Sequence, residues 1–120
     1  MVLGNQTVQS CKLISPRETY DLAQKGTGVL LLDVRTRGEY NNELGHVAHT
    51  LLIPINELER RVGELEPRRK DTIVAICRSG ARSGRATELL AQLGFVAINM
   101  EGGMIRWNRE GLPVARGGDE

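Results

Sequence analysis

Short runs of consecutive apolar residues divide the chain. They are separated by longer stretches in which apolar residues recur every three or four positions. The runs are Val29–Leu32, Leu51–Ile53, Thr72–Ile76 and Val96–Ile98. Uninterrupted runs of this length are typical of strands buried on both faces, as in a parallel sheet covered by helices. A further short strand is predicted over Cys11–Ile14.

The segment before the first run has the signals of a helix capped at both ends. Ser15 can cap its start, Pro16 suits the first helical position and Glu18 completes a capping box. Gly26 is predicted to end this helix in a left-handed conformation.

Residues 55–62 and 83–93 place apolar side chains at helical spacing, and Gly94 stops the second segment. Strands that alternate with helices predict an α/β domain with a mainly parallel central sheet and helices on both faces. We expect the first, third and fourth apolar runs to be neighbouring strands. Ligands bind at the carboxyl ends of strands in such sheets, and Cys77 directly follows one of these strands.

Composition fits one domain over residues 1–120, with a core of about 11–114, a loose leader over 1–10 and a tail over 115–120. The chain is 40% hydrophobic and 26% charged, a balance typical of soluble globular domains. Aromatic residues make up 3%, which argues against a stacking surface for single-stranded nucleic acid. The net charge of +1 and the absence of a long apolar stretch predict neither a nucleic acid nor a membrane partner.

The two cysteines, Cys11 and Cys77, do not form a C-x-x-C pair, so no metal is expected. The first ten residues hold no basic region followed by an apolar run, so a secretory signal is not expected. The prediction is a cytoplasmic monomer without a cofactor, in which cysteines stay reduced. Cys11 is interpreted as an inert thiol on the first strand.

The segment that follows the third apolar run carries the candidate chemistry. It reads Cys77-Arg78-Ser79-Gly80-Ala81-Arg82-Ser83 and leads from a predicted strand into a predicted helix. A short loop in this place can turn its backbone N–H groups inward, and with the helix dipole these groups form a cradle for an anion. Gly80 permits the tight turn and Ser83 is the predicted helix cap. A cysteine at the mouth of this cradle is expected to have a lowered pKa and to be largely thiolate near neutral pH.

A lone cysteine after an apolar strand is more often a small buried hydrophobe. The two arginines reverse that interpretation, because positive charge at a helix N-terminus is unfavourable unless an anion binds there. Cys77 is therefore the predicted nucleophile. The predicted substrate-binding residues are Arg78, Ser79, Gly80, Ala81, Arg82 and Ser83.

Motifs on both sides of this loop resemble those of the rhodanese family, over roughly residues 15–114. The upstream matches are Asp33-Val34-Arg35, Glu39-Tyr40, Gly45-His46-Val47 and Ile53-Pro54. The downstream matches are Glu101-Gly102-Gly103, Trp107 and Gly111-Leu112-Pro113. The chain departs from the family at Ala48-His49-Thr50, where a small Gly-Ala pair is usual.

The resemblance implies a rhodanese-like fold and sulfur transfer without a cofactor. The Cys77 thiolate would take the outer sulfur of a small anionic donor such as thiosulfate. The persulfide would then pass that sulfur to cyanide, a thiol or a protein acceptor.

Two other functions stay open. Cysteine-based phosphatases and arsenate reductases of related fold use an anion loop with five residues between Cys and Arg, whereas four separate Cys77 from Arg82. The third possibility is a non-catalytic sulfur carrier or protein-binding module, although inactive relatives of the family commonly lack the loop cysteine.

Asp33 and Arg35 follow a predicted strand and are expected to support the site. A structural ion pair, with Arg35 facing Glu39, is favoured over catalysis.

His46 is expected to fix a turn and His49 to lie on the surface. Trp107 is predicted to lie in the core with Met104 and Leu112. Glu101–Gly103 is predicted to form a tight turn beside the cysteine loop.

Overall fold

The computed structural model describes residues 12–116. The expected leader, the thiol of Cys11 and positions 117–120 of the expected tail lie outside the described residues.

The centre of the fold is a sheet of five parallel strands in the order β1-β5-β4-β2-β3. The strands are β1 (Leu13–Ile14), β2 (Val29–Asp33), β3 (Leu51–Leu52), β4 (Thr72–Ile76) and β5 (Val96–Met100). The first, third and fourth apolar runs are the three central neighbours, β2, β4 and β5, as predicted. Their parallel alignment brings the ends of β2 and β4 to the same edge, where Asp33 is paired with Ile76.

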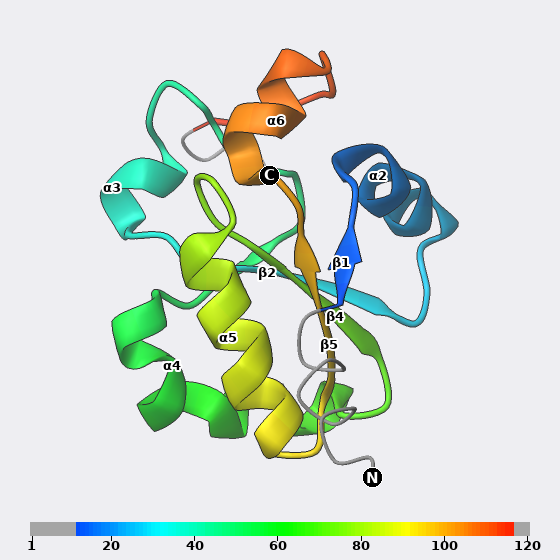
Figure 1. Ribbon diagram of the computed structural model, residues 1–120, viewed down its shortest axis with the longest axis vertical. Helices are drawn as coiled ribbons and strands as arrows, with labels where there is room; N and C mark the ends of the chain where they lie inside the picture. Colours follow the sequence, from blue (N-terminus) through cyan, green and yellow to red (C-terminus); the bar gives the residue numbers. More distant parts are fainter. Residues whose placement is uncertain (1–11, 117–120) are drawn as a thin grey trace, which may run out of the picture.

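Helices cover both faces of the sheet, which confirms the predicted α/β architecture (Figure 1). They are α2 (Pro16–Lys25), α3 (Arg37–Tyr40), α4 (Ile55–Arg61), the 3-10 helix η1 (Val62–Arg68), α5 (Ala81–Gln92) and α6 (Gly103–Arg109). Side chains of α4, η1 and α5 pack into one core layer, and those of α2 and α6 into the other. None of these helices is long and apolar enough to cross a membrane.

The first helix has both predicted caps. The Ser15 hydroxyl accepts a hydrogen bond from the Glu18 N–H, and the Glu18 carboxylate accepts one from the Ser15 N–H. Gly26 ends the helix with φ +81°, in the left-handed region that favours glycine.

Trp107 lies fully buried in the layer beneath α2 and α6, where it packs with Met104 and Leu112 as predicted. Its indole N–H donates a hydrogen bond to the Pro113 carbonyl at 2.9 Å, so its one polar atom has a partner.

Several boundaries differ from the sequence predictions. β2 and β5 extend to Asp33 and Met100, beyond their apolar runs, and β3 ends at Leu52. The helix expected over 83–93 begins at Ala81, and its N-cap is Gly80, so the assignment of Ser83 as the cap is wrong. The helix expected over 55–62 continues as η1 to Arg68. The tail was expected to begin at Ala115, but Ala115 belongs to the folded domain. It pairs with His46 through two backbone hydrogen bonds of 2.8 and 2.9 Å.

Candidate active site

Cys77 directly follows β4 and is 1% exposed, at the edge of the sheet from which α5 begins. Its sulfur accepts a hydrogen bond from the Gly80 N–H at 3.0 Å, and the Ser83 hydroxyl oxygen lies 3.2 Å from it. Gly80 reaches this position with φ +112°, which a residue with a side chain rarely adopts. The loop therefore folds back over the sulfur, as a cradle for an anion requires.

Opposing effects act on the pKa of the Cys77 thiol. Burial raises the pKa, whereas hydrogen bonds from the Ser83 hydroxyl and from the N–H groups of Ser83, Gly80 and Ser79 lower it. The net direction is downward, as expected from the sequence. The site therefore favours the nucleophilic thiolate more than a free cysteine would.

The start of α6 holds the outer side of the loop. The N–H groups of Met104 and Ile105 donate hydrogen bonds to the carbonyls of Cys77 and Arg78, at 2.9 and 3.0 Å. These carbonyls thus point toward α6. Gly103 passes so close that a Cβ atom there would lie 2.4 Å from the Arg78 carbonyl oxygen. The turn over Glu101–Gly103 therefore lies beside the loop, as predicted.

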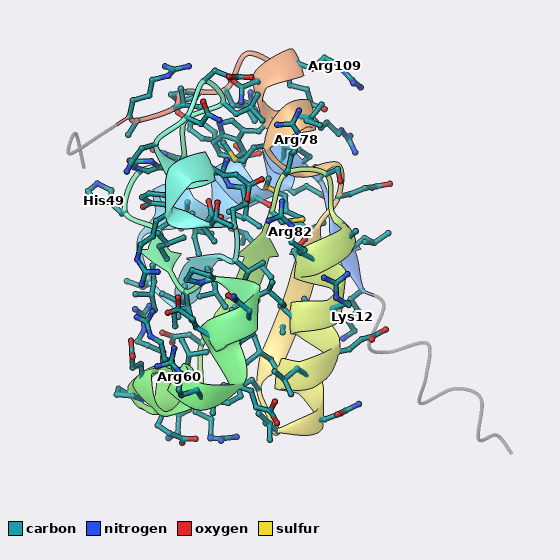
Figure 2. The ribbon with its side chains drawn as sticks, turned by 90° about the vertical axis from the view of Figure 1, so that its left-hand side faces the viewer. Lys12, His49, Arg60, Arg78, Arg82 and Arg109 are labelled. Atoms are coloured by element: carbon teal, nitrogen blue, oxygen red, sulfur yellow. The ribbon has the colours of Figure 1, made fainter. Side chains whose placement is uncertain are left out.

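The side chains of Arg82 and Arg78, both labelled in Figure 2, have different surroundings. Arg82 forms a two-pronged ion pair with the Glu39 carboxylate, at 2.7 and 2.8 Å. Arg78 is exposed, and no ion pair joins it to another residue of the described chain. The charge of Arg82 is therefore largely matched inside the protein, and Arg78 presents its charge to incoming ligands.

The ion pair expected between Arg35 and Glu39 does not form, because the Glu39 carboxylate pairs with Arg82 instead. Arg35 instead pairs with Asp33, with N···O distances of 2.8 to 3.2 Å, and both side chains are buried. Arg35 reaches only the backbone carbonyl of Glu39, at 3.2 Å, and also donates to the Gly45 carbonyl at 2.8 Å. The pair thus joins the end of β2 to α3 and to the loop at Gly45, a structural role in agreement with the favoured interpretation.

The Glu39–Arg82 pair predicts a specific dependence of stability on pH. The hydrogen bond from Arg82 lowers the pKa of Glu39 from 4.5 to about 2. A carboxylate with a lowered folded-state pKa stabilises the fold above pH 4.5, and this contribution is lost as the pH falls toward about 2. Glu39→Gln should therefore lower the free energy of unfolding at pH 7 by about 1 kcal/mol, and the difference should vanish near the lower pH. Urea unfolding at several pH values measures this, with Glu59→Gln on the exposed face of α4 as the control. A loss of equal size at every pH would contradict the prediction.

His46 is buried and its ring stacks on Tyr40, with ring centroids 3.7 Å apart. Its Nδ1 lies 2.9 Å from the Tyr40 carbonyl oxygen. These contacts fix the turn that follows α3, as predicted. His49 is exposed, as predicted, and has φ +66°, a conformation that favours glycine, in the segment where the chain departs from the rhodanese pattern.

One buried polar residue beside the site is not among the residues predicted from the sequence. Asn99 on β5 has its side-chain oxygen 2.5 Å from the Ser83 hydroxyl oxygen and donates from Nδ2 to the Gly80 carbonyl at 3.0 Å. The sequence does contain a signal for this residue. Asn99 directly follows an apolar strand run, and asparagine is a residue type disfavoured in strands. Within residues 12–116, no group of three or more His, Cys, Asp or Glu side chains could hold a metal ion.

The fold and the site together define an α/β domain with a reactive-cysteine candidate in an anion-binding loop. The chain belongs to the rhodanese-like domain family, whose model matches residues 15–110. This finding confirms the resemblance to the rhodanese family.

Individual relatives agree with this assignment. A sulfurtransferase from Allochromatium vinosum is 39% identical over 87 residues, 72% of this chain and 78% of the relative. The thiosulfate sulfurtransferase PspE of Escherichia coli is 33% identical over 73 residues, 61% of this chain and 68% of the relative. The crystal structure of a rhodanese-related protein from Thermoplasma volcanium is 35% identical, with a TM-score of 0.78 over 87% of this chain and 97% of that one.

Proposed function

We propose that this protein is a thiosulfate sulfurtransferase that carries sulfane sulfur as a persulfide on Cys77. The observation that carries the proposal is the position of the Cys77 sulfur, which lies at a strand end among the hydrogen-bond donors of its own loop. The similarity to a thiosulfate sulfurtransferase over 68% of that relative supports the choice of donor.

In the first step the Cys77 thiolate attacks the outer sulfur of thiosulfate. The sulfur–sulfur bond of thiosulfate breaks, and sulfite leaves with the bonding electron pair. The new persulfide carries its negative charge on the terminal sulfur, where the N–H groups of the loop stabilise it. Arg78 attracts the dianionic donor, since its charge has no ion-pair partner within residues 12–116.

In the second step the thiolate of an acceptor, or cyanide, attacks the terminal sulfur. The bond between the two persulfide sulfurs breaks, and its electron pair returns to Cys77 as thiolate. The acceptor leaves with one additional sulfur atom, so the protein is regenerated without a cofactor.

The loop favours sulfur transfer over phosphate ester hydrolysis. Four residues separate Cys77 from Arg82, one fewer than in a phosphatase loop, so the ring of N–H groups suits one sulfur atom better than a phosphoryl group. The Arg82 guanidinium is also held by Glu39 rather than free to bind phosphate.

Mass spectrometry of the intact protein after incubation with thiosulfate tests this function. We expect an added mass of one sulfur atom on Cys77, which cyanide removes as thiocyanate. Cys77→Ser should abolish the adduct, whereas Cys11→Ser should leave it unchanged. An adduct that survives in Cys77→Ser would contradict the proposal.

Turnover assays separate the alternatives that the sequence left open. The wild type should convert thiosulfate and cyanide catalytically and should barely hydrolyse an aryl phosphate. An adduct without turnover would indicate a sulfur carrier, and efficient phosphatase activity without an adduct would indicate the phosphatase function.

A further inference from the structure

The Ser83 hydroxyl has a single hydrogen but three acceptors within reach. Its oxygen lies 3.2 Å from the Cys77 sulfur, 3.2 Å from the Gly80 carbonyl oxygen and 2.5 Å from the side-chain oxygen of Asn99. A serine hydroxyl donates only one hydrogen bond at a time. These acceptors therefore compete for the same proton, and the Asn99 oxygen is the nearest of them.

The orientation of the Asn99 amide is fixed by its other end. Nδ2 donates to the Gly80 carbonyl at 3.0 Å, and a rotated amide would place two oxygens at this distance without a hydrogen between them. The side-chain oxygen thus faces Ser83. Because it can only accept, the proton between these two residues must come from Ser83.

We propose that Asn99 is a positioning residue that competes with the Cys77 thiolate for the hydroxyl proton of Ser83, and so limits the acidity of Cys77. When the Ser83 hydroxyl donates its proton to Asn99, its oxygen presents a lone pair to the sulfur. A neutral Cys77 thiol can donate its S–H hydrogen to that lone pair. When Cys77 is a thiolate, the hydroxyl must rotate toward the sulfur and give up its bond to Asn99. The proposal rests on the proposed role of Cys77 as the nucleophile.

The consequence for sulfur transfer lies in the balance between the two steps. A more acidic thiol is ionised to a greater extent but attacks a donor less strongly, and it leaves more readily from the persulfide. Asn99 would keep the pKa of Cys77 at an intermediate value, between the acidity that favours ionisation and departure from the persulfide and the basicity that favours attack on the donor. The buried position of all three side chains makes the competition effective, because water is excluded as an alternative partner.

Charged side chains of several elements also lie around the sulfur. Arg82 of α5 faces the sulfur, with Glu39 of α3 paired to it and Asp33 of β2 nearby, and Arg78 belongs to the loop itself. The pKa of Glu39 is lowered to about 2 and that of Arg82 is raised, so neither changes charge between about pH 5 and 10. The residues of β5 and α6 that the loop contacts most closely carry no charge; they are Asn99, Gly103, Met104 and Ile105.

The pH dependence of Cys77 alkylation by iodoacetamide, read by mass spectrometry of the Cys77 peptide, tests the proposal. Asn99→Leu removes the competing oxygen and should lower the pKa of Cys77 by about one pH unit, as one additional hydrogen bond to an anion would. Asn99→Ala, which is smaller than the original side chain, should act in the same direction. In the Ser83→Ala background neither change should move the pKa, because the effect passes through the Ser83 hydroxyl.

An unchanged or raised pKa in a folded Asn99 variant would overturn the proposal, as would an equal shift in the Ser83→Ala background. Ser83→Ala alone gives a second test that requires no change at Asn99. It should raise the pKa, because the hydrogen bond from the Ser83 hydroxyl to the sulfur is lost, but by less than Asn99→Leu lowers it, and a rise of a full pH unit or more would show that Asn99 does not draw the proton away. Alkylation requires no sulfur donor, so a failure here is distinguishable from a missing thiosulfate adduct.

Discussion

Asp33→Asn should destabilise the fold by about 3 to 5 kcal/mol, because it leaves the Arg35 guanidinium buried without a counter-charge. Arg35 is 1% exposed and Asp33 is fully buried, so water cannot replace the lost carboxylate. A loss of this size is a large part of the 5 to 15 kcal/mol typical of a domain. Urea unfolding at neutral pH measures it.

The exposed pair between Arg17 and Asp21 on α2 provides the matched control. Their N···O distance is 3.5 Å, and their side chains are 67% and 58% exposed. Asp21→Asn should therefore change the free energy of unfolding by less than about 1 kcal/mol. If Asp33→Asn costs no more than Asp21→Asn, the Asp33–Arg35 pair does not have the structural role assigned to it.

Gly103→Ala should damage both stability and sulfur transfer. The new Cβ would lie 2.4 Å from the Arg78 carbonyl oxygen and 2.5 Å from that of Cys77, and both are backbone atoms that cannot move aside alone. The φ of +59° adds strain for any residue with a side chain. We expect a loss of about 2 to 5 kcal/mol in the free energy of unfolding. Displacement of the loop should also lower the rate of sulfur transfer by about a hundredfold or more.

Gly111→Ala separates the close contact from the backbone strain. Gly111 has φ +74°, but no heavy atom lies within 4 Å of the position of a Cβ there. This variant should therefore lose only about 1 to 2 kcal/mol and retain normal sulfur transfer when folded. Thermal unfolding and a thiosulfate–cyanide assay below the unfolding temperature compare the two variants. Equal losses of activity would contradict the role of Gly103 in holding the loop.

The sequence predicted the parts of the fold that depend on neighbouring residues. The run Thr72–Ile76 is a buried strand with the predicted bounds, because a strand covered on both faces needs apolar side chains at every position. The capping box at Ser15 and the stop at Gly26 are equally local, since each involves residues within one helical turn. The position of the cysteine loop follows from the same pattern, because it lies where a buried strand leads into a helix.

The sequence alone did not show which side chains meet around that loop. Glu39 and Arg82 are 43 positions apart, and they pair because α3 and α5 start at the same edge of the sheet. Asn99 reaches Ser83 and Gly80 because β5 lies next to β4.

Sequence determined the places of the strands, the caps of the first helix and the position of the candidate nucleophile Cys77, whereas the tertiary structure decided the partners of its charged and polar neighbours. Local propensity and periodicity act over a few residues and can be recognised in the chain itself. The choice of partner for Arg35, Arg82 or Ser83 depends on strand order and helix placement. These bring distant segments within hydrogen-bond distance only after the core has packed.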